Sequence, residues 1–549
     1  MFTRTLSSER GVATLIALLM IGMLLLIGLA ALTTSDDESQ IAGNEWREMR
    51  AFYAAEAGLE QAMATLQTEY DSTGLPPAEM PSGAEAINGC DVSYGSTDDG
   101  AAVMRLLSTG ELAGLRALVK TFSVDATAVD DADGSQILMS QTFEVALVPI
   151  FQFAIFYGTD LEIAPGADMS LIGRVHSNGN MYLQANNTLT MDCFVTASGN
   201  IIHGRKGPGA VGTGDVEVKN GVGDYVSMKM GSDWLDSDYE DWYDSSLSRW
   251  NGRVKDEAHG QQALNLPLAS GTDPHALIER ADDNPDSYEN KATLKIIDGV
   301  ALRLADDGSW ADVTAAMLAD GTMKYTADKF TDKRENQTID CTELDVTKMY
   351  DNGHAPRNGV VYFSDEKTAA SEYPALRLVN GTTLDAGLTI ASENPMYTLG
   401  NFNSTQKKPA ALLADAVTFL STNWDDANSA LDKASRVAKR TEVNASYMTG
   451  NVETTASNYS GGFENLPRFL EKWTNVNFTW KGSAVNLWNS TQANSNWNGT
   501  YYDPPNRIWS YDTDLDDPTK LPPETPMIRV FQRTGWQQKY VGYAATQPQ

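Results

Sequence analysis

An apolar segment near the N-terminus, residues 12–32, constrains the fold of this chain more than any other feature. Every residue in it is apolar or small except Thr14. At about 1.5 Å per residue, a helix over this segment spans roughly the 30 Å core of a bilayer. A secretory signal peptide has a shorter apolar region and a small-residue cleavage site, and residues 28–31 lack a clean Ala-x-Ala. We predict a membrane-spanning helix with lipid-facing side chains from Leu15, Ile16, Leu18, Leu19, Leu24, Leu25 and Leu26.

Charged residues flank this segment unequally. Arg4 and Arg10 precede it, whereas acidic residues at 36–38 follow it. Arginine is retained on the cytoplasmic side of a membrane, which predicts that the N-terminus lies inside. The bulk of the chain therefore faces outward.

Beyond residue 32 the apolar residues thin to a stripe with helical spacing. Its members are Met49, Phe52, Leu59, Ala62, Met63, Leu66 and Tyr70. Such a stripe lets one face of a helix bury against a domain. Periodicity alone is equally consistent with a plain membrane anchor followed by a stalk.

Three motifs stand out near the N-terminus: Gly11-Val12-Ala13-Thr14-Leu15-Ile16-Ala17-Leu18-Leu19-Met20, Ile41-Ala42-Gly43-Asn44 and Ala51-Phe52-Tyr53-Ala54-Ala55-Glu56-Ala57-Gly58-Leu59. Over about residues 7–70 they resemble the N-terminal region of PilX-type minor pilins. The resemblance implies that a prepilin peptidase cleaves between Gly11 and Val12. It also implies a long helix that first lies in the inner membrane and later packs with other pilins or pseudopilins in a type IV pilus or pseudopilus. The implied final location is the filament or the cell surface.

Ile16 departs from the pattern of major pilins. Those proteins carry a glutamate at the fifth position after the cleavage site, where it pairs with the N-terminal amine of a neighbouring subunit. Ile16 stands at that position here, and an unpaired carboxylate in lipid is costly. Its absence is similar to PilX-type proteins and K-type pseudopilins, which implies a minor or tip-located subunit.

Composition limits the classes of function. The formal net charge of −32 opposes binding to nucleic-acid phosphates. The length of 549 residues allows two or three domains or one large repetitive domain. Abundant Gly, Asn, Asp, Ser and Thr indicate a turn-rich β protein, so we predict a mainly β chain with a long N-terminal helix.

Three widely spaced cysteines, Cys90, Cys193 and Cys341, exclude a zinc knuckle or a CxxC redox motif. A Cys193–Cys341 disulfide and three buried thiols are both open interpretations.

Short strands alternate with Gly, Asn and Pro turns through most of the chain. A hairpin is predicted from residues 119–129 and 136–148. Further strands are predicted near residues 161–163, 169–172, 174–176, 180–183, 189–196, 201–203, 360–363, 376–379, 388–390 and 396–399. Strands spaced by roughly 8–12 residues favour the stacked coils of a β-solenoid, with a β-sandwich as the alternative. A short helix is expected at residues 313–318.

These patterns predict seven segments. Residues 1–11 form a leader, 12–70 the N-terminal helix and 71–150 a small β-rich linker domain. Residues 151–203 and 359–460 form the two parts of the solenoid, 204–358 a large insertion, and 461–549 an aromatic-rich C-terminal cap. The body, over roughly residues 150–540, also resembles an uncharacterised bacterial family found behind PilX-type N-termini, which implies no known activity. Its motifs are Phe151-Gln152-Phe153-Ala154-Ile155-Phe156-Tyr157, Arg174-Val175-His176-Ser177-Asn178-Gly179-Asn180, Glu393-Asn394-Pro395-Met396-Tyr397 and Phe463-Glu464-Asn465-Leu466-Pro467-Arg468-Phe469-Leu470-Glu471-Lys472-Trp473.

Catalytic motifs are sparse. The five histidines form no HExxH pair, and neither a GxSxG elbow nor a P-loop occurs. His176 beside Arg174 is a candidate acid–base pair, but the favoured interpretation places Arg174, His176 and Asn178 on one strand face, bonded to neighbouring coils. We expect no enzymatic activity and assign no catalytic residue.

Two further segments carry candidate binding residues. Asp512, Asp514 and Asp516 alternate on a loop and are a candidate calcium site, although the glycine and distal glutamate of an EF-hand are missing. Trp497, Tyr501 and Trp509 belong to an aromatic cluster that would suit surface glycans if exposed. Core or capping use is the favoured alternative.

The function predicted from these features is a processed minor pilin-like subunit that displays a large β-rich domain for filament assembly or adhesion. The alternative is a membrane-anchored β-helix protein that binds or cleaves polysaccharide. Removal of residues 1–70 is predicted to leave a soluble, β-rich monomer.

Overall fold

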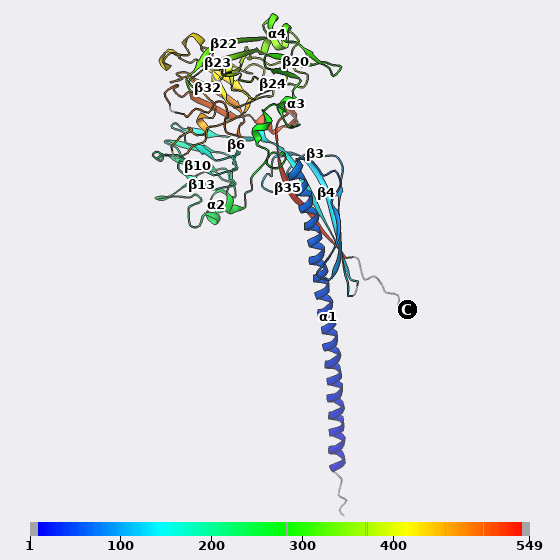
Figure 1. Cartoon of the computed structure of the whole chain (residues 1–549). Helices are drawn as coiled ribbons and strands as arrows, with labels where there is room; N and C mark the ends of the chain where they lie inside the picture. The colour runs from blue at the N-terminus through cyan, green and yellow to red at the C-terminus, as the bar shows by residue number, and fades with distance from the viewer. Residues whose placement is uncertain are drawn as a thin grey trace, which may run out of the picture. The chain divides into compact units, whose positions relative to one another are not determined.

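The chain is mainly β with one long N-terminal helix, as predicted (Figure 1). The computed structural model describes residues 9–132, 134–281, 284–367, 369, 372–455, 457–497 and 499–540. The chain divides into two compact units. The first comprises Met1–Ala101, Lys120–Glu144 and Phe531–Gln549, and the second comprises Ala102–Val119 and Val145–Val530.

The long helix α1 belongs to the first unit, and it is followed by a sheet. Its bounds are Glu9–Thr73. The sheet has the order β1-β2-β4-β5-β35, with β3 paired to β4. These strands are β1 (Ser82–Ile87), β2 (Cys90–Asp98), β3 (Val103–Leu106), β4 (Arg116–Asp130), β5 (Gln136–Pro149) and β35 (Met527–Tyr540). Neighbouring strands β4 and β5 confirm the predicted hairpin; Asp133 in its turn lies outside the described residues.

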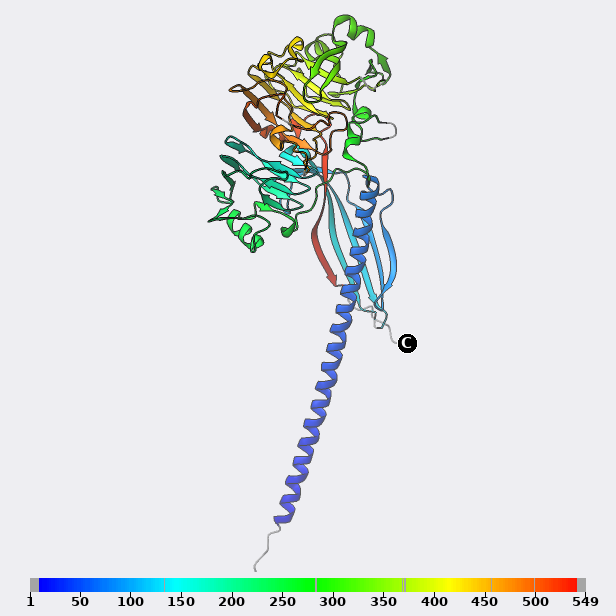
Figure 2. The same ribbon diagram turned by 60° about the vertical axis from the view of Figure 1, so that its left-hand side comes forward.

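Only the C-terminal part of α1 packs on this sheet, and its N-terminal part extends beyond it (Figures 1 and 2). The buried side chains recur at helical spacing: Ala51, Ala54, Ala55, Leu59, Ala62, Met63, Leu66 and Tyr70. At Gly58 the helix lies very close to the sheet. A Cβ at this position would be 2.7 Å from Val92 Cγ1 and 3.3 Å from Ala126 Cβ. Glycine is therefore required for the helix to lie this close to β2 and β4.

Met49, predicted to be part of the buried stripe, is instead 56% exposed. It lies two residues before the buried Ala51, a spacing that places the two side chains on opposite faces of the helix, so Met49 points away from the sheet.

The second unit begins with three sets of parallel strands stacked at a regular interval. Met181 pairs with Leu161 on one side and Ile201 on the other, and this 20-residue offset recurs in the hydrogen bond from Asn180 N to Asp160 Oδ1. Apolar residues of successive strands therefore stack in columns in the core. The sets are β7 (Leu161–Ile163), β10 (Met181–Leu183) and β13 (Ile201–His203); β8 (Met169–Leu171), β11 (Thr188–Met191) and β14 (Asp215–Lys219); and β6 (Phe153–Tyr157), β9 (Arg174–Ser177), β12 (Val195–Ala197) and β18 (Val254–Lys255).

A second group of stacked strands follows the same plan. One set, β24 (Val360–Ser364), β26 (Leu388–Ser392), β28 (Ala410–Ala414), β31 (Ser446–Thr449) and β33 (Ala484–Asn486), is parallel throughout. Another contains β22 (Met323–Asp332), β23 (Gln337–Asp345), β25 (Pro374–Val379), β27 (Met396–Leu399) and β29 (Val417–Leu420), of which only β22 is antiparallel to its neighbour. The third contains β30 (Thr441–Asn444), β32 (Asn477–Gly482) and β34 (Asn506–Tyr511).

One sheet of twelve strands links the two groups, because β6 pairs with β9 on one side and with β33 on the other. At its far end the sheet continues through β19 (Leu294–Ile297), β20 (Val300–Leu304) and β21 (Trp310–Asp312). Residues of the predicted 204–358 insertion thus contribute strands to the main sheets through β14 and β19.

Short elements complete the second unit. Helix α4 (Thr314–Asp320) confirms the helix predicted at 313–318. The single strand predicted over 189–196 is divided into β11 and β12, which belong to different sheets. Between them, Asp192 Oδ1 accepts from Gly173 N at 2.9 Å. The remaining elements are α2 (Trp242–Trp250), α3 (Tyr288–Lys291), α5 (Val346–Asp351), β15 (Tyr225–Ser227), β16 (Lys229–Met230) and β17 (Asp233–Trp234).

All three cysteines are free thiols, with Cys90 and Cys341 buried. The Cys193–Cys341 disulfide is therefore absent, which agrees with the alternative of small, mostly buried apolar residues.

Candidate functional site

The exposed half of α1 is the most unusual surface in the described part of the chain. Leu24, Leu25 and Leu26 are 66–69% exposed, and every residue from 11 to 40 is exposed. Soluble proteins rarely expose a contiguous apolar surface of this kind. Among the described helices only α1 is long and apolar enough to cross a membrane, so this segment is compatible with membrane anchoring.

The predicted processing residues, Gly11 and Val12, lie in the first turns of α1 and are exposed. The preceding leader residues 1–8, including Arg4, are outside the described residues. Gly11 is therefore not covered by the part of the chain that the structure describes.

The packed half of α1 contacts the rest of the first unit through ion pairs as well as through apolar side chains. Arg50 donates from Nε to Asp130 Oδ2 at 3.0 Å, and the Asp130 side chain is fully buried. Further along the helix, Glu60 Oε2 accepts from Arg533 Nη2 at 2.9 Å. The sequence showed Asp130 only as a turn residue, because its partner lies 80 residues away. The C-terminal part of α1 therefore belongs to the folded domain, whereas its N-terminal part is exposed.

His176 lies on β9, between the parallel strands β6 and β12. Its Nδ1 is 2.8 Å from Thr196 Oγ1 on β12, and its Nε2 is 2.9 Å from Asn178 Oδ1. Burial lowers the pKa of His176 to about 4, so the ring is neutral near pH 7. Arg174 contacts the carbonyl of Ala113 and stacks over Phe194. His176 thus contacts a neighbouring strand, as in the favoured interpretation. Arg174 instead donates to a loop carbonyl, and Asn178 lies in the turn after β9 and bonds the backbone of Leu264.

The predicted calcium loop is engaged with lysines. Lys407 Nζ lies 2.6 Å from Asp512 Oδ1 and 2.7 Å from Asp514 Oδ2. Hydrogen bonds from Lys407 and Lys520 lower the pKa of Asp514 to about 2. Asp516 accepts from the hydroxyl of Tyr511 at 2.7 Å. Within the described residues no group of three or more His, Cys, Asp or Glu side chains is placed to hold a metal, and a calcium ion here, which stays a prediction, would have to displace Lys407.

The C-terminal aromatic cluster lies largely in the core. Trp473, Trp480 and Trp488 are buried. Of the three candidate binding residues, Tyr501 is buried, whereas Trp497 and Trp509 are partly buried and pack against the core. Trp480 and Trp509 contact edge to face, with ring centres 5.9 Å apart. These positions fit the core alternative.

Comparison with known proteins adds little to these observations. No family model matches the chain, and no curated protein matches it. Among solved structures, the competence-associated pilin ComZ from Thermus thermophilus aligns with 89% of this chain and 97% of its own length, at 12% sequence identity and a TM-score of 0.27. A TM-score of this size does not establish a shared fold.

Proposed function

We propose that this chain is a pilin-like subunit of a type IV pilus or pseudopilus, inserted through α1 and displaying its second unit outside the cell. The observation that carries the proposal is the division of α1 into an exposed apolar half and a half that is packed on the subunit's own sheet. The first half suits lipid and later the helices of neighbouring subunits. The second holds the helix to the folded domain.

Two finer statements belong to this proposal. The N-terminal motifs support a PilX-type minor subunit that is cleaved after Gly11 by a prepilin peptidase. The parallel strands at a 20-residue offset support a β-solenoid body over the alternative β-sandwich, whose sheets are antiparallel. A body of this size at a filament end would serve assembly priming or adhesion.

The position of the subunit in the filament can be tested at Ile16. Ile16 is 48% exposed on the apolar half of α1. A tip subunit has no neighbour above it whose amine needs a carboxylate partner, so we expect Ile16→Glu not to raise the amount recovered in sheared filaments. An unpaired acid in lipid should lower this amount, because a charged side chain within the bilayer is costly.

The matched control is Ile21→Glu, an equally acidic change elsewhere on the exposed segment. Immunogold labelling of the unaltered protein should mark filament ends at low copy number. Labels spaced at high copy along the shaft, together with increased incorporation of Ile16→Glu alone, would contradict the tip assignment.

A further inference from the structure

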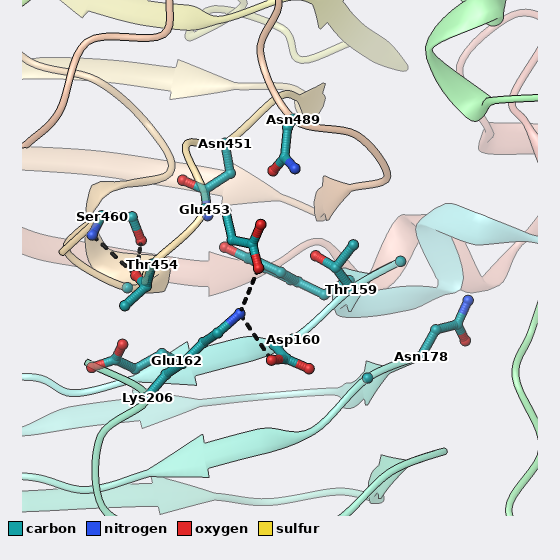
Figure 3. Close-up of a pocket in the computed structure, with 14 residues that line it drawn as sticks. Thr159, Asp160, Glu162, Asn178, Lys206, Asn451, Glu453, Thr454, Ser460 and Asn489 are labelled. Atoms are coloured by element: carbon teal, nitrogen blue, oxygen red, sulfur yellow. Dashed lines mark hydrogen bonds and ion pairs between the residues drawn. The ribbon is translucent and has the colours of Figure 1, made fainter. Parts of the chain in front are cut away.

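Two cavities in the second unit differ in how their charged side chains are paired. The smaller one, of about 250 Å³, lies at the turns after β6 and β9 (Figure 3). There Lys206 Nζ lies 2.9 Å from Asp160 Oδ2 and 3.3 Å from Glu453 Oε1, so the charges are paired within the chain (Figure 3). The larger one has a volume of about 810 Å³, within the roughly 300–1,000 Å³ typical of sites for small molecules.

The walls of the larger cavity come from segments that are distant in sequence. They are β3, the start of β4, the turn between β8 and β9, the segment between β11 and β12, Arg253 just before β18, and the end of β34 with the residues that follow it. All of these residues belong to the second unit. The cavity is therefore part of one compact body.

Arg174 brings a buried positive charge to this cavity without a carboxylate partner. It is 8% exposed. Its guanidinium donates to the carbonyl of Ala113 and stacks over Phe194, with the ring centre 4.2 Å from Cζ. A guanidinium has five N–H donors, and the remaining donors of Arg174 are not enclosed by protein atoms. Among the described residues no carboxylate forms an ion pair with Arg174, and burial lowers its pKa.

Arg253 adds a second guanidinium beside the same aromatic ring. Its Nη1 donates to the carbonyls of Asp192 and Lys219, at 3.0 and 3.4 Å. Its Cζ lies 5.9 Å from the ring centre of Phe194. In the part of the chain that the structure describes, Arg253 also has no ion pair with a carboxylate. Both guanidiniums therefore rely on carbonyl oxygens and the face of one ring, which compensate a buried charge less well than a carboxylate does.

The cavity also has three aspartates in its lining, and these already accept hydrogen bonds from other parts of the chain. Asp192 accepts from Gly173 N at 2.9 Å, Asp516 from the hydroxyl of Tyr511 at 2.7 Å, and Asp517 from the hydroxyl of Thr519 at 2.8 Å. With Arg116, the lining contains three arginines and three aspartates. A ligand with one negative charge fits this balance, whereas the aspartates would repel a multiply charged anion.

Apolar side chains make up much of the remaining lining: Met104, Leu106, Leu115, Ile172 and Pro518. Leu106 and Ile172 are 53% and 48% exposed. An apolar ligand group that covers them removes apolar surface from water, which favours binding. A carboxylate pairs with a guanidinium through two parallel hydrogen bonds, so the lining suits a ligand with both parts.

We propose that this cavity binds an organic monocarboxylate, whose carboxylate pairs with Arg174 and whose apolar part covers neighbouring side chains such as Ile172. The inference concerns only the second unit and does not depend on the function proposed for α1. The carboxylate belongs either to a free acid or to the C-terminus of a peptide that ends in an apolar residue.

Saturation-transfer NMR titrations test the proposal with the full chain in phosphatidylcholine nanodiscs, with empty nanodiscs as the blank. The probes are phenylacetate, its neutral analogue phenylacetamide, and an N-acetylated tripeptide ending in phenylalanine, with a free or an amidated C-terminus. We expect phenylacetate to bind at least about tenfold more tightly than phenylacetamide. Binding of the tripeptide acid but not of its amide identifies a chain end, whereas binding of phenylacetate but of neither tripeptide identifies a free acid.

Variants of two lining residues locate the binding. Arg174→Met removes the charge and keeps an unbranched side chain, so the preference for phenylacetate over phenylacetamide should disappear. Ile172→Asp adds a carboxylate near Arg174 at a half-exposed position and should lower the affinity for phenylacetate about tenfold. Ile172→Asn, which has the same shape without the charge, should lower it less.

The matched control is Ile508→Asp, the same change at a 52% exposed isoleucine of β34 outside the lining, which should leave the affinity unaltered. Ile172→Asp keeps the test decisive even where Arg174→Met fails to fold, because Ile172 is half exposed. Equal affinities for phenylacetate and phenylacetamide in the unaltered chain, or absence of transfer from every probe, would overturn the proposal. An unaltered affinity for phenylacetate in Ile172→Asp would do the same.

Discussion

A chain that lacks residues 1–40 is expected to remain a soluble monomer, whereas one that lacks residues 1–70 is expected to aggregate. The first deletion removes only exposed residues of α1. The second also removes Leu59, Met63 and Leu66, which are buried on the sheet of the first unit. Burial of three such side chains contributes about 5–9 kcal/mol in total, which is comparable to the whole stability of a typical domain of about 5–15 kcal/mol.

Light scattering after size-exclusion chromatography distinguishes the two outcomes, and circular dichroism reports whether the sheets persist. The deletion of 1–70 also uncovers the apolar side chains of β2 and β4 that face α1, among them Val92. The longest N-terminal segment that can be removed without loss of solubility, predicted from hydropathy to end at residue 70, is therefore expected to end at about residue 40. A monodisperse, β-rich protein after removal of residues 1–70 would show that the sheet does not need the helix.

Replacement of Trp473 by alanine is expected to lower the free energy of unfolding of the second unit by about 3–5 kcal/mol, because it empties a large aromatic site. Trp473 is fully buried, with ring centres of Phe469 at 5.5 Å and Phe478 at 5.7 Å. Chemical denaturation followed by tryptophan fluorescence and circular dichroism measures the change.

Trp310→Ala is the matched control. Trp310 is 43% exposed on β21, with Nζ of Lys295 4.9 Å from its ring centre, so its loss should cost about 0.5 kcal/mol or less. Equal, small effects of the two substitutions would contradict the assignment of the C-terminal aromatic cluster to the core.

Local sequence patterns predicted the positions of helices and strands better than they predicted which strands pair with each other. The apolar run, the hairpin of β4 and β5, helix α4 and most strands between residues 161 and 203 were predictable, because hydrophobic periodicity and turn residues determine them locally. The partners of β6 were not, since β33 lies more than 300 residues away and both strands are short. The return of β35 to the N-terminal sheet was missed for the same reason.

The same distinction applies to the candidate sites. A resemblance in sequence indicated Gly11 and Val12, and hydropathy indicated the exposed half of α1. The sequence suggested a metal-binding loop at Asp512 and Asp514, because the lysine that pairs with them, Lys407, is remote in sequence. Glu162 lies between two apolar residues of a short strand, Leu161 and Ile163, and only the folded structure shows that its buried carboxylate lies 3.6 Å from Nε of Arg205.

N-terminal sequencing and intact-mass measurement of the membrane-associated protein, expressed with and without a prepilin peptidase, test the central claim most directly. Cleavage between Gly11 and Val12 leaves the apolar half of α1 intact and frees the amine that a filament subunit presents. The expected result is a chain that begins at Val12 when the peptidase is present and at Met1 when it is absent. A chain that begins at Met1 in both cases, or one that begins near Thr33, would contradict a pilin-like function.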